Sequence, residues 1–122
     1  SRKDPQLLFD HWDFLLKNDY LNVKSPYMLS TVYNLVDSNA DVVNEFYTKM
    51  ITTKQDNAVI ASQIAEAYVY TDLEKAAEWI MQLPDGAEKI ASLEPLLIYF
   101  QERHAEKEYQ KWKSYQNSLK KE

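Results

Sequence analysis

The chain has 122 residues, of which 45% are apolar and 27% are charged, and its formal net charge is −5. A chain of this length and composition can bury a hydrophobic core as one domain, and it is too apolar for an intrinsically disordered protein. Its only glycine is Gly86, which excludes P-loops and dinucleotide fingerprints and argues against β-rich folds. Because cysteine is absent, disulfides, thiolate catalysis and cysteine-ligated zinc are excluded.

The charge is unevenly distributed, with eight acidic residues and three lysines in residues 51–100. An acidic surface repels phosphate groups, so nucleic acids and anionic membranes are disfavoured partners. The longest apolar run, residues 96–100, is much shorter than the roughly 18–20 residues that span a bilayer. We therefore expect a soluble protein without a membrane segment, and the sequence leaves its compartment and oligomeric state open.

Helical periodicity runs through almost the whole chain. Two helix starts combine a capping residue with a proline at the first helical position, at Asp4-Pro5 and Ser25-Pro26. The strongest turn signal is the segment 83–86, Leu-Pro-Asp-Gly. The predicted helices cover approximately residues 4–17, 25–36, 39–50, 57–70, 72–83, 87–103 and 105–118.

Pro95 lies inside the sixth predicted segment. Proline lacks the N–H group that a helix interior uses. We therefore expect Pro95 either to kink this helix or to lie in the first turn of a helix capped by Ser92.

No set of catalytic or metal-binding residues is recognisable. His11 falls on the apolar stripe of the first helix, so we expect it to be a partly buried packing residue. His104 and Glu108 are four residues apart, but one such pair is weak evidence for a metal site, and an exposed histidine is the better interpretation. The acidic residues near Asp72 are explained by the dipole of a helix start. We therefore predict no catalytic residues, no metal and no cofactor.

Large aromatic residues recur at a nearly constant interval. Trp12, Phe46, Trp79 and Trp112 follow one another at spacings of 34, 33 and 33 residues. In the first helices of two hairpins, Leu29-Ser30-x-x-Tyr33 lies 35 residues before Ile64-Ala65-x-x-Tyr68. Such periods are typical of helical-hairpin repeats, in which each hairpin buries its apolar face against the next.

The segment from Ile64 to Ala77 resembles the tetratricopeptide repeat, with Ile64-Ala65, Tyr68 and Ala77 at that family's small, tyrosine and alanine positions. It departs from the family at Ala61 and Met81, where larger aromatic residues are usual. Residues 76–86 are also similar to the Ala-x-x-Trp-x-x-x-Leu-Pro-x-Gly signature of bacterial helical-repeat proteins. Both resemblances imply a right-handed superhelix with a concave binding face.

We therefore predict an all-α fold in which antiparallel helical hairpins stack as a short right-handed solenoid of about seven helices. One helical-repeat domain would span residues 1–122, and it could belong to a longer repeat array. The alternative is a compact helical bundle in which the aromatic spacing has no structural meaning.

The predicted function is a non-catalytic scaffold that binds another protein or a peptide. If the first helix of each hairpin lines the concave face, as in the family that the chain resembles, the groove residues are Tyr27, Thr31, Asn34, Gln63, Glu66 and Tyr70. One alternative is an RNA-binding array of the pentatricopeptide type, which the acidic middle of the chain disfavours. Another is a small acidic helical-bundle subunit or inhibitor that acts by covering a partner's surface.

Overall fold

The computed structural model describes residues 5–120, which form eight α-helices without any strand. The predicted cap Asp4 lies outside the described residues. The all-α prediction is confirmed, and the helices lie close to their predicted ranges. They are α1 (Pro5–Asp10), α2 (Trp12–Lys17), α3 (Pro26–Val36), α4 (Ala40–Met50), α5 (Asn57–Val69), α6 (Leu73–Gln82), α7 (Ala87–Glu102) and α8 (Glu106–Lys120).

The first predicted helix is divided at His11 into α1 and α2, which gives eight helices in residues 5–120 instead of about seven. The backbone of His11 departs from helical geometry, with φ −109° and ψ 20°. Its ring Nδ1 lies 2.9 Å from the Leu7 carbonyl oxygen, which also accepts the His11 N–H. Side-chain competition for a helix carbonyl is a usual cause of such a distortion. His11 is exposed, so the expectation that it packs in the core was wrong.

Side-chain caps fix where several helices begin. Ser25, which the sequence predicted as a cap, accepts a hydrogen bond from a backbone N–H of the first turn of α3. Asn39 and Asp72 do the same at the starts of α4 and α6. Asp56 caps α5 in the same way. Because these N–H groups have no partner inside the helix, a capping oxygen stabilises the helix start by about 1 kcal/mol.

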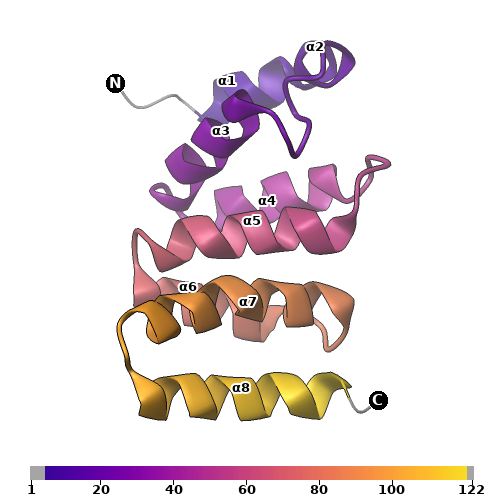
Figure 1. The fold of residues 1–122 in the computed structure, drawn as a ribbon. Coiled ribbons are helices and arrows are strands. Elements are labelled where there is room, and N and C mark those ends of the chain that lie inside the picture. The colour runs from indigo at the N-terminus through magenta and orange to yellow at the C-terminus, as the bar shows by residue number, and fades with distance from the viewer. Residues whose placement is uncertain (1–4, 121–122) are drawn as a thin grey trace.

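The helices follow one another from α1 at the top to α8 at the bottom, and those from α3 to α8 run back and forth between short turns (Figure 1). The turns α3–α4, α5–α6 and α7–α8 lie at one side of the molecule, and α4–α5 and α6–α7 at the other (Figure 1). The most extensive contact joins α5 to α7; α3 also packs on α5, and α7 on α8. The first helices of successive hairpins, α3, α5 and α7, are therefore neighbours, and we call them the odd layer.

The hydrophobic core is a single cluster that extends from Leu8 to Leu119. Phe46, Trp79 and Trp112 each occupy the seventh position of their helix, α4, α6 and α8. Trp12 meets Phe46 edge-on at 5.8 Å between ring centroids, and Trp79 meets Tyr47 in the same way at 5.5 Å. The predicted register of four aromatic residues therefore holds for Phe46, Trp79 and Trp112, but not for Trp12, which is the first residue of α2.

The alignment predicted for the first helices was wrong. Leu29 is 46% exposed, whereas Ile64, its proposed counterpart, is 1% exposed. The three helices of the odd layer instead align at a spacing of 32 residues, which makes the buried residues Val32, Ile64 and Leu96 equivalent. The alignment paired Leu29-Ser30 with Ile64-Ala65 because each pair precedes a tyrosine at the same interval. A small residue can precede tyrosine on either face of a helix, so this similarity does not identify the buried face.

Pro95 lies within one continuous helix, α7, which begins well before Ser92. A helix capped by Ser92 is therefore excluded. Proline has no N–H to donate to the carbonyl four residues earlier, which here is that of Ala91.

Candidate functional site

The predicted groove residues of α3 do not lie on one open surface. Tyr27 is partly buried beside Tyr20, with 5.2 Å between their ring centroids. Thr31 is only 6% exposed and belongs to the core, whereas Asn34 is partly buried near the end of the helix. A partner on the surface could reach Tyr27 and Asn34 in part and Thr31 hardly at all.

The predicted residues of α5 are closer together. Gln63 is partly buried and donates from Nε2 to the Val23 carbonyl oxygen at 2.6 Å, which ties α5 to the segment before α3. Glu66 and Tyr70 are exposed. Thr31 and Glu66, which the sequence alignment made equivalent, therefore differ in environment, since one is buried and the other faces solvent.

Tyr33 joins α3 to the exposed face of α5. Partial burial raises the pKa of the Tyr33 hydroxyl, and the nearby Glu66 and Tyr70 raise it further. Both effects disfavour the charged phenolate. The structure therefore brings Tyr33, Glu66 and Tyr70 together, although Tyr33 was expected to be a packing residue only.

An open groove runs between α5 and α7, and we call it the α5–α7 groove. Its volume is about 330 Å³. It includes Glu66 and Tyr70, two of the six predicted residues. Its lining residues are Ala58, Val59, Ser62, Glu66, Tyr70, Ala91, Glu94, Pro95 and Ile98.

The groove combines exposed apolar side chains with two carboxylates. Val59, Tyr70 and Ile98 are 38%, 46% and 46% exposed. Side chains of this size usually lie in a core, so their grouping around one hollow is typical of a binding surface. Glu66 on α5 and Glu94 on α7 are the charged residues of the lining.

Contacts from neighbouring residues fix parts of the groove wall. Glu94 Oε2 accepts a hydrogen bond of 2.6 Å from Gln116 Nε2 on α8, and Gln116 is fully buried. Ser62 donates to the Val59 carbonyl oxygen at 2.9 Å. Tyr70 packs edge-on against Tyr99 at 6.1 Å between ring centroids. These contacts join groove residues to α8, to the α5 backbone and to Tyr99.

The α7 half of the groove was missed by sequence reasoning. Ala91, Glu94, Pro95 and Ile98 follow the i, i+3, i+4, i+7 spacing of one helix face. That spacing was available in the sequence. The repeat alignment of the first helices covered only the segments that form α3 and α5, so it predicted no groove residue on α7.

The described chain has other hollows besides this groove. One, of about 290 Å³, lies beside Trp79 and the turn between α3 and α4. Another, of about 300 Å³, lies around Gln55 and the connector after α2, and a further one, of about 270 Å³, lies at the α7–α8 turn. These three do not gather exposed apolar side chains as the α5–α7 groove does.

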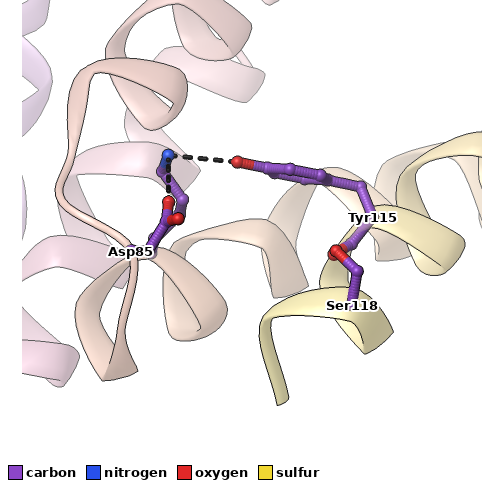
Figure 2. A network of polar contacts seen from close by, with 4 residues as sticks. Asp85, Tyr115 and Ser118 are labelled. Atoms are coloured by element: carbon purple, nitrogen blue, oxygen red, sulfur yellow. Dashed lines mark hydrogen bonds and ion pairs between the residues drawn. The ribbon is translucent and has the colours of Figure 1, made fainter. Parts of the chain in front are cut away.

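A buried lysine forms a separate polar cluster between α7 and α8. The Lys89 side chain is almost fully buried, and its Nζ donates to Asp85 Oδ1 and to the Tyr115 hydroxyl, both at 3.1 Å. Figure 2 shows Asp85 and Tyr115 converging on that nitrogen, with Ser118 one turn away. Burial alone lowers the pKa of Lys89, but the hydrogen bonds and charges of Tyr115 and Asp85 outweigh it and raise the pKa above 10.5. Lys89 is therefore protonated at neutral pH, and its hydrogen bond to Tyr115 joins α7 to α8.

Within residues 5–120, no group of three or more His, Asp or Glu side chains is arranged to hold a metal ion. In the same part of the chain, no helix is both long and apolar enough to cross a bilayer.

Comparisons with known proteins were made at three levels. No protein-family model, no curated protein and no solved structure matches the chain significantly.

Proposed function

We propose that this chain is a non-catalytic scaffold that binds a protein or peptide, built from tetratricopeptide-like helical hairpins stacked as a short right-handed solenoid. The observation that carries the proposal is the α5–α7 groove, where Val59, Tyr70 and Ile98 expose apolar surface around a hollow between two first helices. Exposed aromatic and aliphatic side chains beside a rigid hollow are common anchors for a binding partner.

The packing of the odd layer supports the same proposal. In a stack of hairpins, each first helix contacts the first helix of the next hairpin, and α3, α5 and α7 do so here.

The charge of the groove favours a protein partner over RNA. An RNA-binding surface needs cations for the phosphates, and the charged residues of the groove lining are Glu66 and Glu94.

A labelling experiment tests the proposal. The sequence has no cysteine, so Ser62→Cys in the groove can carry one environment-sensitive fluorophore, which we call the groove label. Ser114→Cys on the exposed face of α8 carries the matched control label. A phage-displayed library of random peptides is selected on the unlabelled protein, and the enriched peptides are then titrated into both labelled variants.

We expect saturable fluorescence changes of the groove label and none of the control label. Replacing both Val59 and Ile98 with serine should weaken binding without altering the circular dichroism spectrum, because both side chains lie at the surface, 38% and 46% exposed. Failure to enrich any peptide, or a response confined to the control label, would contradict the proposal.

A further inference from the structure

We infer that the α5–α7 groove selects a partner segment that presents a lysine or arginine beside an aliphatic or aromatic side chain. This inference rests on the proposed function and specifies the chemistry of the partner. It follows from the charges of the odd layer, from the acceptors in the groove and from the contact that Arg103 makes with Tyr99.

The accessible charged side chains of the odd layer are all acidic. Helix α3 contains no charged residue, and Glu66 is the only one in α5. Helix α7 contains three glutamates and Lys89, whose side chain is buried against Asp85 and Tyr115. The second helices differ, since α4, α6 and α8 each carry both acidic and basic residues.

Two of these glutamates face the groove. Glu66 and Glu94 line it from opposite helices, whereas Glu88 lies near Tyr47 of α4, where its charge raises the pKa of that hydroxyl after the larger effect of burial. A basic side chain between Glu66 and Glu94 would meet a carboxylate on either wall. Attraction of this kind adds specificity as well as affinity.

The groove also contains hydrogen-bond acceptors. Pro95 cannot donate to the Ala91 carbonyl, and both residues line the groove. The Ser62 hydroxyl already donates to Val59. A partner that supplies donors therefore fits better than one that supplies acceptors, and lysine and arginine are the side chains with several donors and no acceptor.

A cation of the chain itself, near the edge of the groove, is already engaged. Arg103 stacks on the Tyr99 ring, with its guanidinium carbon 3.8 Å from the ring centroid, and Tyr99 in turn contacts Tyr70 at the edge of the groove. Arg103 is not part of the groove lining. Arg103 therefore does not serve as the cation of the groove, and an incoming cation would meet Glu66 and the Glu94 oxygen that does not accept from Gln116.

The test uses the peptides selected in the experiment above. For one enriched sequence, three synthetic forms are compared: the selected form, one with its basic residues replaced by glutamine, and one with them replaced by glutamate. Each is titrated into protein that carries the groove label. The same titrations are made with Glu66→Gln/Glu94→Gln in that background, and with Glu45→Gln/Glu74→Gln as the control, which removes two exposed carboxylates from α4 and α6.

The substitution Glu94→Gln keeps an oxygen that can accept from Gln116, so the groove variant should fold normally. Exposed ion pairs contribute about 0.2–1 kcal/mol each, so the groove variant should bind the selected peptide roughly 2- to 25-fold more weakly. The control should bind it unchanged. The affinity for the selected peptide should also fall as ionic strength rises, and the glutamate form should bind weakest.

The outcomes separate this inference from the proposed function. If enriched peptides lack basic residues, or if the glutamine and glutamate forms bind at the groove label as tightly as the selected form, the inference fails while the groove remains a binding site. If peptides do not perturb the groove label at all, both fail. A fluorescence change of the groove label caused by adding unlabelled protein alone would mean that a second copy is the occupant, which also overturns the inference.

Discussion

Three residues of the described chain, 5–120, adopt positive φ angles, and only one of them is glycine. Gly86 has φ 151°, while Asp19 and His104 have φ 67° and 57°. His104 follows α7 in a Schellman arrangement, in which its N–H donates to the Gln101 carbonyl and the Ala105 N–H donates to that of Phe100. Glycine usually takes this position at a helix end. Because His104 occupies it here, its left-handed backbone conformation is strained.

Two substitutions test this backbone strain with opposite signs. Gly86→Ala should lower the free energy of unfolding by about 1–3 kcal/mol, because φ 151° with ψ −163° is accessible almost only to glycine. An added Cβ would meet only Glu88 Oε1, at 3.9 Å, so crowding adds little. His104→Gly should raise the free energy of unfolding by roughly 0.5–1 kcal/mol. Urea denaturation measures both, and stabilisation by Gly86→Ala would refute the argument.

The Lys89 cluster predicts a pH-dependent contribution to stability. Its pKa is raised in the folded protein, so its stabilising effect is complete below pH 10.5 and is lost as the pH rises through the folded-state value. Tyr115→Phe removes one acceptor and should cost about 1.5 kcal/mol at neutral pH.

Denaturation at several pH values measures this effect. The difference between Tyr115→Phe and the unmodified protein should shrink above pH 10.5, the ordinary pKa of lysine. Tyr70→Phe, at an exposed tyrosine, is the control and should stay within about 0.5 kcal/mol of the unmodified protein. A difference for Tyr115→Phe that does not change with pH would show that Lys89 is not involved.

Among the helices, α8 has its main packing partner on one side only, in α7. Gln116 forms the centre of this interface, with Nε2 donating to the Ile90 carbonyl at 3.1 Å and to Glu94. In the sequence, Gln116 is a polar residue between the apolar residues Trp112 and Leu119 of the same helix. The structure shows instead a buried position at which a polar side chain is satisfied on the opposite helix.

Gln116→Ala should therefore release α8 before the rest of the molecule. We expect a loss of about 2 kcal/mol, because the substitution removes both hydrogen bonds from Nε2, together with the one that Oε1 accepts from Lys113, and leaves a space in the core. Amide hydrogen exchange should accelerate in α8 more than in α5. Asn117→Ala, at the adjacent exposed position, should leave the amide exchange rates of both α8 and α5 unchanged. Equal acceleration of α5 and α8 would mean that the two helices unfold together.

The positions of the helices could be predicted because their signals are local. Caps such as Ser25 and Asp72, and the turn that contains Gly86, act on the residues beside them. The equivalence of the first helices could not be predicted, because it depends on which face of α3 meets α5. The division at His11 was also missed, since it results from one side-chain hydrogen bond to a carbonyl.

Of the two helices that line the α5–α7 groove, only α5 contributes residues that the sequence predicted. Glu66 and Tyr70 line the groove, and their prediction depended on a repeat alignment whose other half, at Thr31, fell in the core. Ile98 and Pro95 were missed because a groove between two helices requires both to be placed. That the predicted residues bind a partner stays a prediction.

At the scale of the whole molecule, the two sets of helices differ in character. The odd layer presents apolar and acidic side chains, whereas the second helices carry charges of both signs. This difference is consistent with a stack that binds through its first helices and meets solvent through the others.

The most direct test of this account is a chemical cross-link across the α5–α7 groove. The substitutions Ser62→Cys and Ala91→Cys, which line the groove from its two helices, are joined with a short bis-maleimide, and peptide binding is measured before and after. Ser62→Cys with Ser114→Cys serves as the control pair. We predict rapid cross-linking within one molecule and loss of peptide binding for the groove pair alone. Absence of that cross-link, or unchanged binding after it forms, would contradict the account.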